Sequence, residues 1–85
     1  PGIHPTALVA PTAIVSKTAY VGPYCIIGEN ARIGDSVKLE SHVSLDKNVS
    51  VGDGTHLFPH VTVGPRTQIG KNCEIKANTI LGGEG

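Results

Sequence analysis

Residues 19–36 read AYVGPY, CIIGEN and ARIGDS, three consecutive units of six residues that share one pattern. Each unit begins with a small residue, and a branched aliphatic residue and a glycine follow at its third and fourth places. The six-residue step continues in both directions without a change of register, and such an internal repeat decides the fold before any other feature. Its third place holds Ile3, Val9, Val15, Val21, Ile27, Ile33, Leu39, Leu45, Val51, Leu57, Val63, Ile69, Ile75 and Leu81.

Each unit predicts a short strand followed by a corner. The small and the aliphatic residue are two positions apart, so in an extended chain they point to the same face. Glycine and proline then interrupt the strand, glycine because it tolerates positive φ and proline because its ring presets a turn. The third position after the aliphatic residue often suits the left-handed backbone of a tight corner. Residues of that kind stand at Asn30, Asn48, Gly54, Asn72 and Asn78.

Three such units close a triangular coil, and parallel strands of successive coils would stack about 4.8 Å apart. Because a coil takes about 18 residues, the 85-residue chain would make between four and five coils of an all-β parallel β-helix. We expect one domain over residues 1–85, no α-helix, and an inward-pointing side chain at every aliphatic position from Ile3 to Leu81.

The composition excludes several classes of function. Lys and Arg number 7, as do Asp and Glu, so no excess of positive charge points to nucleic acid or an anionic membrane. No apolar run approaches the roughly 18 residues that span a bilayer. Cys25 and Cys73 lie too far apart in the sequence to suggest a disulfide framework, which favours a reducing compartment and predicts a cytoplasmic location.

Three stretches resemble known hexapeptide-repeat enzymes. The opening PGIHPTALVAPTA, residues 1–13, resembles the start of the β-helix in the UDP-3-O-acylglucosamine N-acyltransferase family of lipid A biosynthesis. The tail LFPHVTVGPRTQIGKNCEIKANTILGGEG, residues 57–85, is similar to later coils of that family. Residues 22–43, GPYCIIGENARIGDSVKLESHV, are similar to the related UDP-N-acetylglucosamine O-acyltransferase family. The N-acyltransferase family is the better match.

The resemblance implies a left-handed β-helix, a hand opposite to the usual crossover rule. It further implies transfer of a 3-hydroxyacyl chain from acyl carrier protein to a UDP-glucosamine derivative by a homotrimer, without a cofactor. The families place their general-base histidine in coils that would lie beyond Gly85, and the uridine-binding domain that precedes the helix has no counterpart here. We therefore expect a portion of a longer enzyme that holds no catalytic residue of its own.

The four histidines are the candidate functional residues, with His42 and His60 foremost. These two are 18 positions apart, so they should stack in one corner column between Tyr24 and Asn78. The pair suits contact with substrate, binding of a metal or general-base chemistry, but outward corners also accept any polar residue, and that plainer interpretation is favoured.

The other two histidines, and both cysteines, are expected to be structural. His56 should lie on the outer face between Lys38 and Glu74, and His4 should shape the first turn. Cys25 and Cys73 fall at inward small-residue positions, where cysteine acts as a small buried hydrophobe, and neither joins a nucleophile constellation.

Two other functional classes are alternatives to the acyltransferase. A γ-class carbonic anhydrase shares the fold but needs three histidine ligands for zinc, and its Arg-Gly-Asp stretch and clustered histidines are absent, so no metal site is expected. A structural or engineered solenoid without catalytic activity stays open. An ice-binding surface is disfavoured because Thr6, Thr12 and Thr18 fall on three different corners.

Outward apolar residues predict a contact surface. Leu8, Ile26 and Ile80 share one outer column, and exposed apolar clusters on small proteins commonly mark interfaces. We expect the Leu8–Ile26 strip to pack against a neighbouring chain or another domain.

Overall fold

The computed structural model describes residues 1–82; residues 83–85, which close the tail and the expected domain, lie outside the described part. Residues 1–82 contain no helix, as predicted, and fold into fourteen strands of two residues each. The strands are β1 (Gly2–Ile3), β2 (Leu8–Val9), β3 (Ile14–Val15), β4 (Tyr20–Val21), β5 (Ile26–Ile27), β6 (Arg32–Ile33), β7 (Lys38–Leu39), β8 (Ser44–Leu45), β9 (Ser50–Val51), β10 (His56–Leu57), β11 (Thr62–Val63), β12 (Gln68–Ile69), β13 (Glu74–Ile75) and β14 (Ile80–Leu81).

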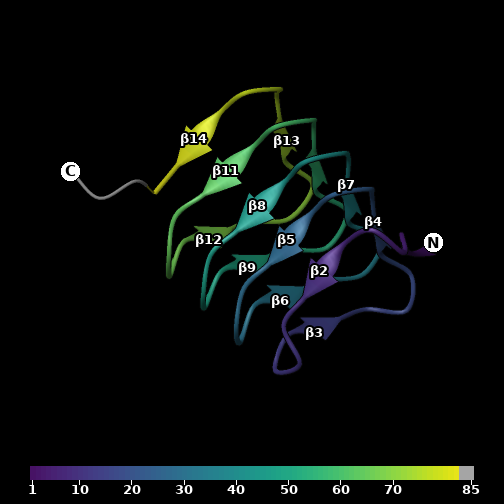
Figure 1. Cartoon of the computed structure of the whole chain (residues 1–85). Coiled ribbons are helices and arrows are strands. Elements are labelled where there is room, and N and C mark those ends of the chain that lie inside the picture. The colour runs from purple at the N-terminus through teal and green to yellow at the C-terminus, as the bar shows by residue number, and fades with distance from the viewer. Residues whose placement is uncertain (83–85) are drawn as a thin grey trace.

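The strands form three parallel sheets, one on each side of a triangular coil. Sheet A has the order β1-β4-β7-β10-β13, sheet B the order β14-β11-β8-β5-β2, and sheet C the order β12-β9-β6-β3. Figure 1 shows the coils stacked along one axis, with the purple first coil and the yellow last coil at opposite ends. Each residue pairs with the one 18 positions away, as Val21 does with Leu39. The predicted parallel solenoid is confirmed, and it fits the left-handed β-helix that the resemblance implies.

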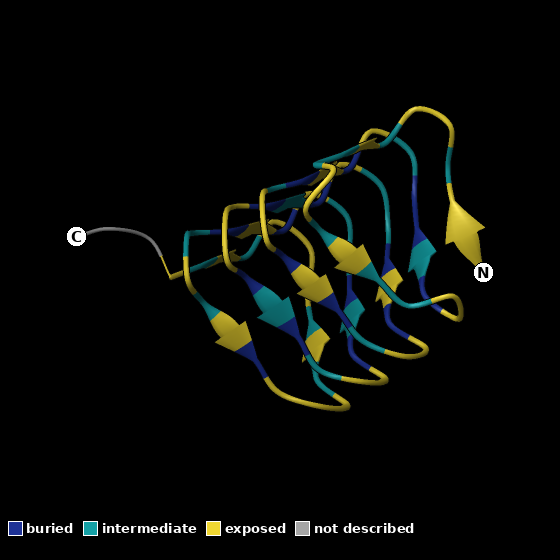
Figure 2. Ribbon diagram, turned by 90° about the horizontal axis from the view of Figure 1, so that it is seen from below, coloured by how far each residue is buried: buried dark blue, intermediate teal, exposed yellow. Residues whose placement is uncertain are grey.

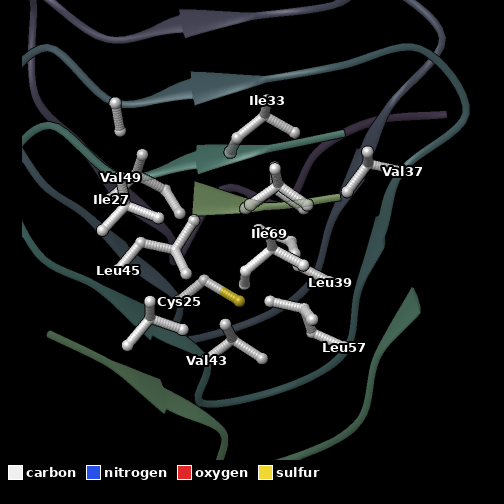
Figure 3. Close-up of a cluster of buried hydrophobic side chains, with 14 of the residues drawn as sticks. Cys25, Ile27, Ile33, Val37, Leu39, Val43, Leu45, Val49, Leu57 and Ile69 are labelled. Carbon is white, nitrogen blue, oxygen red and sulfur yellow. The ribbon is translucent and has the colours of Figure 1, made fainter. Parts of the chain in front are cut away.

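The inner aliphatic columns form the core together with the small residues beside them. Val21, Leu39 and Leu57 of sheet A are fully buried, and Figure 3 shows such side chains meeting from all three sheets. Because each coil is covered only by its neighbours, burial falls toward the ends (Figure 2). Ile3 keeps its predicted place in the inner column, in register with the buried Val21, but it is not enclosed. That residue pairs with Val21 on one side only and stays 47% exposed.

The corners use the left-handed backbone more widely than the sequence predicts. All five predicted positions have positive φ, and so do bulkier residues, among them Tyr24 (φ 59°), His42 (φ 60°) and His60 (φ 63°). From the third coil on, the corner N–H donates to a backbone carbonyl of the previous coil, for example from His60 to Ser41 at 3.1 Å. This repeated hydrogen bond stabilises positive φ, a backbone conformation that residues other than glycine adopt rarely.

The corners of the first coil are built differently. Thr6, Thr12 and Thr18 are not among the positive-φ residues, in keeping with the resistance of β-branched side chains to that region. Their hydroxyl oxygens accept the corner N–H groups of the second coil instead. Thr6 Oγ1, for instance, accepts the N–H of Tyr24 at 3.0 Å.

At two positions the glycine that follows the aliphatic residue is needed for close packing rather than for positive φ, whereas Gly82 has the predicted positive φ of 63°. Gly28 and Gly52 do not have positive φ; they lie where the backbone of the next coil comes closest. A Cβ atom on Gly52 would be 2.6 Å from the carbonyl carbon of Gly70, and one on Gly28 would be 2.7 Å from that of Asp46. Glycine is therefore required here by the closeness of successive coils.

This closeness gives a test of the stacking. Gly52→Ala should destabilise the chain by about 1–3 kcal/mol, because the added methyl group meets backbone that cannot move aside. Gly70→Ala is the matched control: it lies in the same column, and a Cβ there meets nothing closer than Cys73 Sγ at 3.9 Å. Its stability should change by less than about 1 kcal/mol. Urea unfolding followed by circular dichroism measures both, and equal midpoints for the two variants would contradict the packing described.

Candidate functional site

A column of aromatic rings runs along the corner between sheets A and B. The ring centroids of His42 and His60 are 4.7 Å apart with planes inclined by 16°, and those of Tyr24 and His42 are 5.2 Å apart and inclined by 31°. All three residues are exposed, and Asn78 continues the column in the next coil. The stacking expected from the 18-residue spacing is therefore present. It offers two neighbouring imidazoles to solvent, each able to donate or accept a hydrogen bond.

A second cluster lies beside this column on the outer face of sheet A. His56 Nε2 donates to the carboxylate of Glu40 from the preceding coil, and the rings of His56 and Phe58 stack with centroids 4.0 Å apart. The Lys76 ammonium lies 4.5 Å from the Phe58 centroid, within the range of a cation–π interaction. His56 does lie between Lys38 and Glu74, as expected, but it is partly buried and held by partners.

The two clusters together form one surface, which we call the histidine edge. It contains three of the four histidines and all three Tyr and Phe residues of the chain. Its members are Tyr20, Tyr24, Lys38, Glu40, His42, His56, Phe58, His60, Glu74, Lys76 and Asn78. The Glu40–His56 pair does not follow from the 18-residue spacing, because its two residues occupy different columns. The sequence indicates this pair only through its spacing of 16 residues, which places Glu40 one coil before His56 and two positions nearer the corner than His56.

His4 shapes the first turn, as the sequence predicts. Its Nδ1 lies 2.9 Å from Thr6 Oγ1 and accepts the Thr6 N–H at 3.2 Å. The imidazole is thus tied to the first corner, in the coil that precedes Tyr24.

A shallow groove of about 330 Å³ crosses the outer side of sheet C. It lies over Gly34 and Gly52, which have no side chains to fill it, and Arg32 lines it together with Asp35 and Asp53. Asp53 Oδ1 accepts the Asp35 N–H at 2.8 Å, and the Asp35 carboxylate accepts the hydroxyl of Ser16. These carboxylates are thus bonded within the protein, so the groove ranks below the histidine edge as a candidate site.

The cysteines lie in the interior columns as predicted. Cys25 is fully buried and donates to the carbonyl oxygen of Glu40 at 3.0 Å, whereas Cys73, near the last coil, is partly exposed. Burial raises the pKa of the Cys25 thiol, which lowers its thiolate fraction and hence its reactivity.

Within residues 1–82, no group of three or more His, Cys, Asp or Glu side chains is arranged to hold a metal ion. The same part of the chain has no helix with the length and apolar character needed to cross a bilayer.

The parallel coils and the six-residue repeat define a β-solenoid of the hexapeptide-repeat class. Within it, the chain belongs to the GMPPB C-terminal domain family, whose family model matches residues 3–83. No curated protein sequence matches the chain.

Among solved structures, the chain is similar to the crystal structure of Entamoeba histolytica serine acetyltransferase 1 in complex with L-cysteine. The TM-score is 0.59 and the sequence identity 22%, over 92% of this chain. The chain spans 37% of the length of that protein, and the likeness establishes the shared fold.

The cysteines provide a test of the interior columns. At pH 8 a thiol reagent should label Cys73 in the native chain, while Cys25 should react only after unfolding, because it is buried and its pKa is raised. Mass spectrometry of labelled peptides follows each thiol separately. Cys73→Ser should abolish the early label. Equal labelling rates for the two thiols in the native chain would show that Cys25 is not enclosed.

Proposed function

We propose that this chain is the β-helix portion of a hexapeptide-repeat acyltransferase. The observation that carries the proposal is the exposed pair of imidazoles, His42 and His60, stacked 4.7 Å apart on one corner of a parallel solenoid. Such a pair presents hydrogen-bond donors and acceptors at fixed positions, as recognition of a polar substrate requires. The solved structure with a similar fold is that of a serine acetyltransferase.

The specific reaction we propose is transfer of a 3-hydroxyacyl chain from acyl carrier protein to a UDP-glucosamine derivative in lipid A biosynthesis, in the cytoplasm and without a cofactor. The support for it is the resemblance of residues 1–13 and 57–85 to the N-acyltransferase family. In that reaction the sugar amine attacks the thioester carbonyl and an amide bond forms as the carbon–sulfur bond breaks. A base takes the amine proton and passes it to the leaving sulfur, so that acyl carrier protein is released as the free thiol. His42 and His60 contact the substrate, and the base is a histidine of coils beyond Gly85.

A second candidate is a structural solenoid that supports or assembles another protein. The match over residues 3–83 to a family described as a C-terminal domain favours it, because such a module accompanies a larger chain. In that case the histidine edge would be a surface of the scaffold.

An acyl-transfer assay separates the two candidates. The 85-residue chain should show no transfer from 3-hydroxyacyl–acyl carrier protein to the UDP-sugar, because the expected base is not in it. A longer protein that contains this chain and the following coils should form the acylated sugar, detected by mass. His42→Ala and His60→Ala should each reduce its rate about 5- to 30-fold, the loss expected for one or two kcal/mol of binding. Gln68→Ala, an exposed position on the outer side of sheet C, serves as the control outside the histidine edge. A folded longer protein that transfers no acyl chain would favour the scaffold.

We also propose that the functional protein is a homotrimer joined through sheet B. Leu8 and Ile26 are neighbours on β2 and β5 and are 68% and 51% exposed. Ile80, 72% exposed, is not part of a continuous strip, because Ser44 and Thr62 lie between it and Ile26 in the column. The proposed interface is therefore the Leu8–Ile26 pair, and Ile80 provides a matched control.

Sedimentation of three forms of the chain tests this interface. The parent chain should sediment as a trimer at micromolar concentration and the Leu8→Ser, Ile26→Ser variant as a monomer. Ile80→Ser should behave like the parent chain, although it also removes an exposed isoleucine. The double variant should melt at a lower temperature because association adds to stability by mass action. The proposed interface would be contradicted if the parent chain stayed monomeric and folded and melted at the same temperature as the double variant.

A further inference from the structure

The groove on the outer side of sheet C has polar groups along both of its walls. One wall follows β3, β6 and β9, which Figure 1 shows in successive coils, and carries Ile14, Arg32 and Ser50. The other wall is the corner that carries Asp35 and Asp53, and glycine backbone forms the floor between them. Its volume of about 330 Å³ is at the lower end of the range of about 300–1,000 Å³ for small-molecule sites, so it has room for one ring-sized ligand.

The corner wall presents fixed hydrogen-bond acceptors. Asp53 Oδ1 accepts the Asp35 N–H at 2.8 Å and occupies the place that a Cβ atom on Gly34 would need, so this carboxylate reaches over the floor. Asp35 Oδ1 accepts the Ser16 hydroxyl. Each carboxylate is thus held by one oxygen, and the other oxygen has no hydrogen-bond partner within residues 1–82. Both carboxylates are exposed, so these second oxygens can accept from a ligand.

The strand wall presents donors and an apolar surface. The Arg32 side chain is exposed, and in the described part of the chain its guanidinium makes no ion pair or hydrogen bond, although Asp35 and Asp53 line the same groove. Its five N–H donors therefore face the acceptor wall without closing the groove. The hydroxyl of Ser50 lies beside it, and Ile14, 55% exposed, adds apolar surface.

This arrangement selects against charged ligands. Two carboxylates against one guanidinium disfavour an anion, and the Arg32 charge together with the internal bonds of both carboxylates disfavours a metal cation. A zwitterion would gain little, because ion pairs in a groove open to solvent are weak. A neutral ring with several hydroxyls can donate to one wall and accept from the other, and its C–H face can lie against Ile14.

We propose that this groove is a carbohydrate-binding site, in which neighbouring hydroxyls of one sugar ring donate to the Asp35 and Asp53 carboxylates and accept from the Arg32 guanidinium. The site is separate from the histidine edge, which lies on sheet A and its corner with sheet B, and it does not depend on the proposed acyl transfer. An open groove of this size should bind a single sugar with a dissociation constant of about 1 mM or above.

NMR titration of the 85-residue chain with methyl glucoside, methyl galactoside and methyl mannoside tests the proposal. Each sugar is added to about 50 mM, well above the expected dissociation constant. At least one of the three should shift the backbone amide resonances of Gly34 and Gly52, which form the floor. The resonances of His42 and His60 should stay in place.

Substitutions on both walls identify the groups that hold the sugar. Arg32→Gln and Asp53→Asn should each raise the dissociation constant at least about fivefold, because a hydrogen bond to a charged group is replaced by a weaker neutral one. Asparagine keeps Oδ1 as the acceptor for the Asp35 N–H, so the corner should stay folded. Gln68→Ala is the matched control: Gln68 shares the column of Arg32 and Ser50 but does not line the groove, and its affinity should stay within about twofold of the parent value.

Four results would overturn the inference. They are the absence of shifts at Gly34 and Gly52 with all three sugars, equal shifts with cyclohexanol, whose ring carries a single hydroxyl, unchanged affinity in folded Arg32→Gln and Asp53→Asn variants, and shifts confined to His42 and His60. The last result would assign sugar binding to the histidine edge instead.

Discussion

Parallel pairing of each strand with the strand 18 residues away is the constraint on which the rest of this structure depends. The pairing is strictly in register, for instance Leu39 with Leu57 and His56 with Lys38. It places side chains of corresponding positions directly over one another at about the spacing of neighbouring strands. Inward positions must therefore accept a stacked neighbour of similar size, and outward positions form columns whose chemistry is set by residues far apart in the chain.

The same constraint explains the two unusual features of the corners. Successive coils approach so closely at Gly28 and Gly52 that a single methyl group does not fit between their backbones. Positive φ at nine non-glycine residues is maintained because corner N–H groups find acceptors in the coil before. Conformations that cost free energy in an isolated turn are thus repeated along the solenoid, where the regular hydrogen bonds offset that cost.

Much of this fold can be predicted from the sequence because three six-residue repeats span the same 18 residues that separate hydrogen-bonded strands. The inner columns and the His42–His60 stack follow from spacing alone. The Glu40–His56 pair does not, because it joins different columns and depends on side-chain rotamers. The groove over Gly34 and Gly52 depends on the absence of side chains, and the repeat gives no hint of the different corners at Thr6, Thr12 and Thr18. Ile3 belongs to the inner pattern but lacks a covering coil, an effect of position that a repeat cannot express.

The 18-residue coil also limits how the length of such a chain can change during evolution. Insertion of a whole coil would leave every later residue on the same side of the triangle, with sheets A, B and C each one strand longer. Insertion of a single six-residue unit would preserve the inward aliphatic pattern but turn all following residues by one side. The three sides differ in chemistry, so such a change would divide the aromatic column between two corners while leaving the core intact. Insertions or deletions of 18 residues would therefore preserve both the fold and the surface columns. Those of six residues would preserve the fold alone.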